Sequence, residues 1–345
     1  MLKFEGARSE KNCITISSLV GTKKSHSELK VGNGVKILRK DPVLRVQGLT
    51  KQIGAKKIVD KVSFEVYPGE IFGFLGPNGA GKTTTIRMIV GLSAISEGDV
   101  WIKGVSLKKN FEQAIAHVGG IVENPELYKF LTGYQNLLHF WRMCKGVSKE
   151  RIDEVVRIVG LEKRIHEKVK TYSLGMRQRL GLAQALLHSP SILILDEPTN
   201  GLDPAGIREF RDLLKKLAAE TGLAVFVSSH ILSEMELMCD RIGIIQQGKL
   251  IEVKEVRDFV DAEEEHAVLF LIDPLPEADS YLKKMFPDYQ LTVTEDGILA
   301  KIKREQIPDL NAMLVTHGIR VYGIQKATKT LEDRFLEITG GGQIA

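Results

Sequence analysis

Short alternations of apolar and polar residues mark the first predicted strands of the chain. Residues 43–46 (VLRV) and 62–66 (VSFEV) alternate as half-buried strands do, and a Pro-Gly turn follows them. The continuous apolar run 71–75 (IFGFL) then leads directly into a glycine-rich loop and a helical pattern over 84–91. These patterns predict a small antiparallel sheet, followed by a strand, loop and helix in the order typical of phosphate-binding turns.

The middle of the chain changes from a helical period to buried strands. Between about residues 112 and 180 apolar positions recur with helical spacing and strand patterns are few, which predicts a helical insertion. Two continuous apolar runs, 192–195 and 223–227, then flank a helical pattern at 207–220. Because such runs are typical of strands buried on both faces, we expect a parallel sheet covered by helices.

A third pattern begins after Asp261 and alternates strands and helices in the order βαββαβ, which is typical of a ferredoxin-like domain. The predicted strands are 267–272, 290–294, 298–303 and 319–325, and the predicted helices are 277–286 and 305–317. The chain therefore divides into a basic, disordered tail over 1–41, an α/β domain over 42–257 and a small α+β domain over 262–340.

Composition narrows the class of protein. The chain has 345 residues, of which 43% are hydrophobic and 27% charged, as expected of a globular protein with about two domains. No stretch approaches the ~18 consecutive apolar residues of a membrane-spanning helix, and residues 1–30 lack the apolar core of a secretory signal. The widely spaced cysteines Cys13, Cys144 and Cys239 favour a reducing compartment over a disulfide framework.

The formal net charge of +4 is unevenly distributed. Residues 1–40 carry nine Lys/Arg and three Glu, so the rest of the chain is slightly acidic. Because the basic excess lies in one peripheral segment, we do not expect a nucleic acid partner. We interpret this segment as a solvated tail, with contact to anionic lipid headgroups or to a partner protein as the alternative.

Residues 76–83 (GPNGAGKT) match the phosphate-loop pattern G-x-x-x-x-G-K-[ST] in full. Glycines allow backbone N–H groups to surround phosphates, while Lys82 meets the β- and γ-phosphates and the Thr83 hydroxyl ligates Mg²⁺. A chain of this composition contains the bare pattern by chance with a probability of about one in a hundred. The predicted nucleotide-binding residues here are Gly76, Pro77, Asn78, Gly79, Ala80, Gly81, Lys82, Thr83 and Thr84.

Two acidic residues follow the apolar run 192–195. A parallel strand would deliver Asp196 and Glu197 to the carboxyl edge of the sheet, where ligands bind in open α/β sheets. One carboxylate can hold Mg²⁺ and the other can orient a water molecule. The alternative is a pair of solvated acids at the end of a strand.

Residues 172–179 (YSLGMRQR) precede the acidic pair and resemble the signature motif of ABC ATPases. A segment similar to the D-loop, 201–204 (GLDP), and a histidine after two serines, His230, follow in the order of that family. The span 43–255 is thus similar to an ABC transporter nucleotide-binding subunit. The resemblance implies ATP as nucleotide, Asp196 as the magnesium-side acid, Glu197 as the water-polarising base and His230 as the γ-phosphate sensor. A structural histidine is the alternative for His230.

The signature segment also has a physical interpretation of its own. Ser173 can cap, and Gly175 can open, the amphipathic helix that follows, and an ordinary capped helix is the alternative. In the family this helix end faces ATP bound on another subunit. One Lys82 loop and one Ser173 helix per chain therefore imply a homodimer, or pseudo-dimer, with two composite sites. The resemblance adds Asp203 to the nucleotide-site residues.

Three positions depart from the usual pattern of the family. Ile53 stands where the family usually has an aromatic ring against adenine. Glu123 stands where it usually has a glutamine that links Mg²⁺ to the helical insertion, so a carboxylate would add negative charge at this part of the nucleotide site. The signature keeps Ser173 and Gly175 but has Leu174 and Met176 in place of a glycine and a glutamine.

The last two departures together resemble a bacterial subgroup associated with bacitracin and lantibiotic self-protection, whose ATPases pair with separate membrane subunits. Residues 330–336 (TLEDRFL) also resemble the end of exporter ATPases in that wider group. We therefore expect a P-loop ABC ATPase core with a mixed sheet, an antiparallel edge and a helical insertion. Its expected function is to hydrolyse ATP at the cytoplasmic side of the cell membrane and so export an amphiphilic compound, a peptide antibiotic, through a separate transmembrane permease.

The alternative function is that of a soluble ABC ATPase acting on ribosomes or DNA. Family members of that kind usually carry two cassettes or a long coiled coil, whereas this sequence has one phosphate loop and no sustained heptads. The C-terminal domain is interpreted either as a ligand sensor or as a dimerisation or packing appendage.

Overall fold

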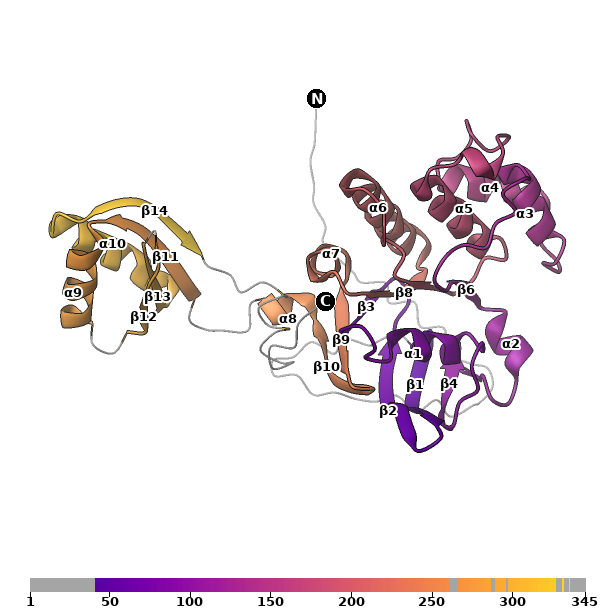
Figure 1. The fold of residues 1–345 in the computed structure, drawn as a ribbon, viewed down its shortest axis with the longest axis horizontal. Helices are drawn as coiled ribbons and strands as arrows, with labels where there is room; N and C mark the ends of the chain where they lie inside the picture. The colour runs from indigo at the N-terminus through magenta and orange to yellow at the C-terminus, as the bar shows by residue number, and fades with distance from the viewer. Residues whose placement is uncertain are drawn as a thin grey trace, which may run out of the picture. The chain divides into compact units, whose positions relative to one another are not determined.

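The computed structural model describes residues 41–260, 266–286, 289–295, 297–326, 331 and 335. Apart from Asp41, the predicted basic tail lies outside the described residues, as does most of the chain after Lys326. We call residues 41–260 the α/β part and residues 266–326 the C-terminal part, and Figure 1 shows the elements of each.

Two sheets form the frame of the α/β part (Figure 1). The six-stranded sheet has the order β10-β9-β3-β8-β7-β6, in which all neighbours are parallel except β10 and β9. The second sheet is antiparallel, with the order β2-β1-β4-β5. Their strands are β1 (Leu44–Ile53), β2 (Lys56–Val66), β3 (Ile71–Leu75), β4 (Glu97–Ile102), β5 (Val105–Ser106), β6 (Val118–Ile121), β7 (Ile192–Asp196), β8 (Ala224–Ser229), β9 (Arg241–Gln246) and β10 (Lys249–Glu255).

Alternate side chains of the six-stranded sheet enter two different cores, which explains its continuous apolar runs. Phe72 and Phe226 stack in the core that contains α1 and the antiparallel sheet, whereas Leu75 and Leu195 enter the core that contains α3–α7. The predicted parallel sheet, buried on both faces, is confirmed. The helices are α1 (Lys82–Ile89), α2 (Phe111–Ile115), α3 (Gly133–Trp141), α4 (Arg151–Ile158), α5 (Leu174–Leu186), α6 (Pro204–Thr221), α7 (Leu232–Met238) and α8 (Val256–Val260), with a 3₁₀ turn at Val169–Thr171.

The helical stretch predicted over 112–180 is wrong at one place. Residues 118–121 form β6, which pairs in parallel with β7 at the edge of the sheet. This strand has four residues, two of them glycines, so it shows no strand pattern in the sequence. Gly119 is needed there because a Cβ would lie 2.3 Å from the carbonyl oxygen of Ala185 on α5.

The C-terminal part is a four-stranded antiparallel sheet with the order β12-β13-β11-β14. This is the strand order of a ferredoxin-like arrangement. Its core contains Phe270 and Ile298 from the sheet together with Leu282 and Leu314 from the two helices. The elements are β11 (His266–Asp273), α9 (Leu275–Met285), β12 (Leu291–Val293), β13 (Gly297–Ile302), α10 (Ile307–Thr316) and β14 (Arg320–Lys326), with a 3₁₀ turn at Arg304–Gln306.

Two further expectations concern cysteines and membrane spans. Cys144 and Cys239 are free thiols, while Cys13 lies outside the described residues. Burial raises the pKa of Cys239, which packs against Gly73 so closely that a Cβ on this glycine would lie 2.8 Å from the sulfur. Within the described ranges, every helix is too short or too polar to cross a bilayer.

Candidate active site

The predicted phosphate loop connects the end of β3 to the start of α1. Gly79 and Gly81 have φ angles of 76° and 108°, which are left-handed values that glycine adopts without strain. At Gly76 a Cβ would lie 2.3 Å from the carbonyl oxygen of Ile245 on β9. The glycines are therefore required by the shape of the loop, which places the first N–H groups of α1 beside it.

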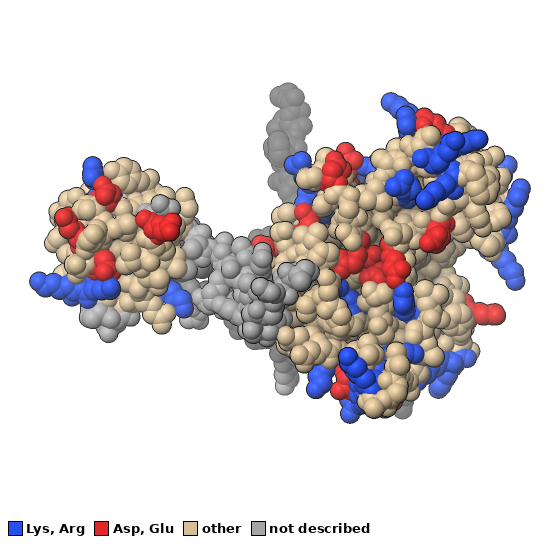
Figure 2. All heavy atoms as spheres, in the orientation of Figure 1, with Lys and Arg blue, Asp and Glu red and all other residues tan. Residues whose placement is uncertain are grey.

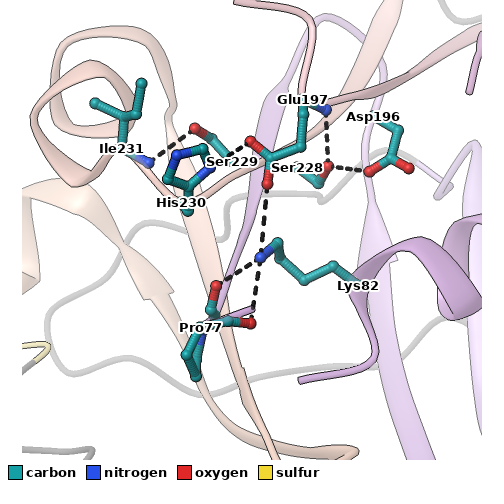
Figure 3. Close-up of polar contacts among 9 residues, drawn as sticks. Pro77, Lys82, Asp196, Glu197, Ser228, Ser229, His230 and Ile231 are labelled. Atoms are coloured by element: carbon teal, nitrogen blue, oxygen red, sulfur yellow. Dashed lines mark hydrogen bonds and ion pairs between the residues drawn. The ribbon is translucent and has the colours of Figure 1, made fainter. Parts of the chain in front are cut away.

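Lys82 is the first residue of α1 and is 6% exposed. Its Nζ donates to the carbonyl oxygens of Gly76 at 2.6 Å and Pro77 at 3.4 Å. The same Nζ lies 3.6 Å from Oε1 of Glu197 (Figure 3). The ammonium group of Lys82 thus lies over the loop in which a phosphate would bind. It also lies close to the carboxylate of Glu197, which follows another strand.

The two predicted acidic residues lie at the carboxyl end of β7, beside the end of β8. Asp196 is 2% exposed, and its Oδ1 accepts a 2.6 Å hydrogen bond from the hydroxyl of Ser228. The backbone N–H of Glu197 donates to the same hydroxyl at 3.1 Å. Glu197 has a φ of 49°, an uncommon backbone conformation for a non-glycine residue that is often found at functional sites.

His230 lies at the junction of β8 and α7, and its Nδ1 is 2.8 Å from Oε2 of Glu197. Because an ionised carboxylate only accepts hydrogen bonds, the Nδ1–H of His230 is the donor. Figure 3 shows Glu197 between Lys82 and His230, with each carboxylate oxygen facing one of them. The structure thus brings together three residues that are far apart in the sequence.

Ser228, one of the two serines before His230, is a candidate site residue that the sequence patterns did not identify. The register of β7 and β8 places it directly opposite Asp196, where its hydroxyl contacts both acidic residues. A serine at the end of a buried strand next to the acidic strand is the pattern that could have identified it. Only knowledge of which strands are neighbours makes that pattern readable.

The predicted signature residues form a second group on other elements. Ser173 caps α5 by accepting a 3.2 Å hydrogen bond from the N–H of Met176. Asp203 caps α6 in the same way through the N–H of Gly206 at 3.3 Å. The start of α5 lies against the loop before α6, since a Cβ on Gly175 would be 3.8 Å from Leu202.

Glu123 and Ile53, the two residues outside the signature that depart from the family pattern, are both exposed. The side chain of Glu123 is 58% exposed and forms an ion pair with Arg87 of α1. Glu123 also has a left-handed φ of 67° and follows β6 by two residues. Ile53, at the end of β1, is 61% exposed. That Glu123 acts on Mg²⁺ therefore stays a prediction, and its carboxylate has a cationic partner already.

A glycine loop that opens a helix with a buried lysine, together with two carboxylates at the end of another strand of the same parallel sheet, defines a P-loop nucleoside triphosphate hydrolase. Residues 59–200 match the ABC transporter family. The chain is 59% identical over 298 residues to YhcH, an uncharacterised ABC transporter ATP-binding protein of Bacillus subtilis (strain 168), with 86% of this chain and 96% of that protein covered. The chain belongs to the ATP-binding proteins of ABC transporters, and it is an ATPase of that family.

Two further proteins extend the comparison, one of them a transport protein and the other a solved structure. The chain is 42% identical over 303 residues to the bacitracin transport ATP-binding protein BcrA of Bacillus licheniformis, with 88% of this chain and 99% of that protein covered. It also matches the dimeric structure of the ATP-binding cassette MJ0796 in a post-hydrolysis state bound to ADP and Pi, with a TM-score of 0.56 and 25% identity over 62% of this chain and 99% of that chain. The α/β fold is that of ABC cassettes.

Proposed function

We propose that this chain powers the export of an amphiphilic peptide antibiotic through a separate transmembrane subunit. The 42% identity to a bacitracin transport ATP-binding protein, which extends over almost the whole of that protein, supports this class of substrate. The proposed hydrolysis of ATP rests on one observation: Lys82, Glu197 and His230 lie together at the carboxyl edge of the parallel sheet. ATP is the nucleotide that the family binds.

The contacts of Glu197 suggest how the chain's own residues act on ATP. Lys82 binds the β- and γ-phosphates, so its Nζ turns from Glu197 towards the nucleotide. Glu197 then keeps its hydrogen bond from His230. This bond orients the carboxylate toward an attacking water molecule. His230, as the sensor of the γ-phosphate, thereby couples the presence of that phosphate to the position of the base.

Mg²⁺ is the metal that we infer for this site, with Thr83 and Asp196 as its protein ligands. Both side chains offer hard oxygen atoms, and one or two protein oxygens completed by phosphates and water are the usual magnesium environment. Asp196 is buried and oriented by Ser228, as a ligand at a fixed position requires. When bound, the ion neutralises negative charge on the phosphates.

Dimerisation is proposed because the signature group lies apart from the phosphate loop. The side chains of Ser173 and Asp203 are exposed, and each accepts a hydrogen bond from a backbone N–H of its own helix end. In a two-fold dimer, the Ser173 end of α5 in one subunit would complete the Lys82 site of the other subunit. The dimeric form of MJ0796 supports this arrangement.

The surface charge of the helical part supports a position at the cytoplasmic face of the membrane. Residues 142–179 contain eleven Lys/Arg and five Asp/Glu. Figure 2 shows Lys and Arg side chains gathered over the region of α3 to α5. A basic surface is attracted to the anionic lipids of the cytoplasmic leaflet, by about 1 kcal/mol for each Lys or Arg near it.

Co-purification tests the transport role directly. We expect a multi-spanning membrane protein to co-purify with the full chain from detergent-solubilised membranes, and ribosomes or DNA in its place would contradict the proposal. Cells that carry the wild-type chain and its partner would then be compared with cells that carry Lys82→Ala. We expect the variant to lose resistance to bacitracin or a lantibiotic but not to a small hydrophilic antibiotic, which serves as the matched control.

A further inference from the structure

Two residues near the end of the chain lie in the core of the α/β part. Leu331 and Phe335 come after β14, the last strand of the C-terminal part. They are 0% and 2% exposed and belong to the core that contains α3–α7. Both have helical backbone, and both side chains pack in this one core.

The first of these residues is hydrogen-bonded to the helix after His230. The backbone N–H of Leu331 donates to Oε2 of Glu236 at 3.2 Å. Glu236 lies on α7, which begins two residues after His230. This bond therefore attaches the end of the chain to the element that immediately follows the γ-phosphate sensor.

The second residue lies beside the active site itself. Phe335 lines a narrow gap together with Leu75 at the end of β3, Gly76 of the phosphate loop, and Ser229, His230 and Leu232. The gap leaves no room for a water molecule. Phe335 is thus one of the residues that enclose the narrow space between the start of the phosphate loop and the loop that carries His230.

We propose that Phe335 is a positioning residue for His230. The Nδ1 side of the imidazole is fixed by Glu197, and Phe335 limits how far the loop around His230 can move toward the phosphate loop. A tightly packed interior transmits such a constraint because neighbouring groups have little space to shift. Phe335 follows the C-terminal part in the chain, so the segment that leaves that part packs against the residues around His230.

Phe335 could also be no more than a stabilising core residue, and the catalytic constants distinguish the two roles. A core residue changes the fraction of folded enzyme, whereas a positioning residue changes kcat of the enzyme that is folded. A residue that acts through His230 also has no effect once His230 is removed, because its only route to the reaction is gone.

The experiment measures kcat and KM for ATP in the full chain, for Phe335→Ala and Phe335→Leu, each in the wild-type and His230→Ala backgrounds. We expect Phe335→Ala to lower kcat about tenfold with KM within about twofold, and Phe335→Leu to recover most of the loss. In the His230→Ala background, Phe335→Ala is expected to cause no further loss. Phe210→Ala is the matched control, because Phe210 is equally buried in the same core on α6.

Circular dichroism and the thermal midpoint establish that each variant is folded at the assay temperature. If Phe335→Ala does not fold, Glu236→Ala removes the acceptor for Leu331 from a partly exposed position, and we expect it to lower kcat about threefold. Equal losses of kcat in both backgrounds, or in Phe210→Ala, would overturn the proposal. A low kcat in His230→Ala with wild-type kcat in Phe335→Ala would overturn it too, while leaving the role of His230 intact.

Discussion

The phosphate-loop group and the signature group are built in opposite ways. Lys82, Glu197 and His230 come from three elements, and their side chains contact one another across the sheet edge. Ser173 and Asp203 instead use their side chains to cap the helices that they begin. We propose that the first group forms most of a catalytic site within one chain, and that the second, at exposed helix ends, contributes to the site of another subunit.

This difference shows which half of the reaction depends on assembly. The contacts within the phosphate-loop group are formed by a single chain, so we expect the binding of ATP at Lys82 to require one chain only. We expect a contribution of Ser173 to require a second chain, because its hydroxyl caps α5 within its own subunit. Variants in the two groups are therefore expected to separate binding from hydrolysis.

The largest effect is expected for Lys82→Ala. The loop would lose its fixed positive charge at the β- and γ-phosphates, so hydrolysis is expected to fall to the assay background and ATP binding to weaken. Hydrolysis is measured by phosphate release and binding with a fluorescent ATP analogue. Undiminished phosphate release from the purified variant would remove the assignment of the phosphate loop.

The next effect is that of Glu197→Gln, which preserves size and hydrogen bonding but removes the base. Loss of general base catalysis lowers the rate by roughly 10²- to 10⁴-fold. ATP binding is expected to survive, and the ATP-bound variant is expected to accumulate as a dimer on a sizing column. A variant that binds ATP and still elutes as the wild type does would contradict the composite-site arrangement.

Ser173→Ala tests the signature group. The loss of an N-cap costs about 1 kcal/mol of helix stability, and the hydroxyl is also lost from the helix end that would meet ATP on the other subunit. We expect the ATPase rate to fall about tenfold with ATP binding unchanged, measured as for Lys82→Ala.

Thr132→Ala is the matched control for Ser173→Ala. Thr132 caps α3 through a complete capping box, so its loss removes the same kind of helix cap at a position outside both groups. We expect a similar decrease in the unfolding midpoint but an unchanged ATPase rate. If the two variants lose activity equally, Ser173 acts only as a helix cap.

The smallest effect is expected for Glu123→Gln. Because the carboxylate is exposed and paired with Arg87, its contribution to stability is at most about 1 kcal/mol, and the unfolding free energy is expected to stay within about 0.5 kcal/mol of the wild type. A magnesium titration of the ATPase is expected to shift by less than about fivefold. Arg87→Gln changes the local charge in the opposite direction, so we expect its titration to shift the opposite way. Identical titrations of all three proteins would make Glu123 a solvated loop acid.

The sequence by itself determined the elements whose patterns are local. The run 71–75, the glycine loop and Lys82 form a continuous strand, loop and helix, and each step depends on residues that are adjacent in the chain. The runs 192–195 and 223–227 likewise became β7 and β8, because burial on both faces requires apolar residues at every position. The order of elements after Asp261 could be read from alternation in the same way.

Tertiary structure alone decided the features that depend on neighbours distant in the sequence. The two glycines of β6 gave no strand pattern, because the reason for Gly119 is the carbonyl of Ala185 on a helix formed much later in the chain. Ser228 gains its role only from the register that places it opposite Asp196. The burial of Phe335 beside His230 depends on the chain returning, after the sheet of the C-terminal part, to the core that contains α3–α7, and no local pattern records that return.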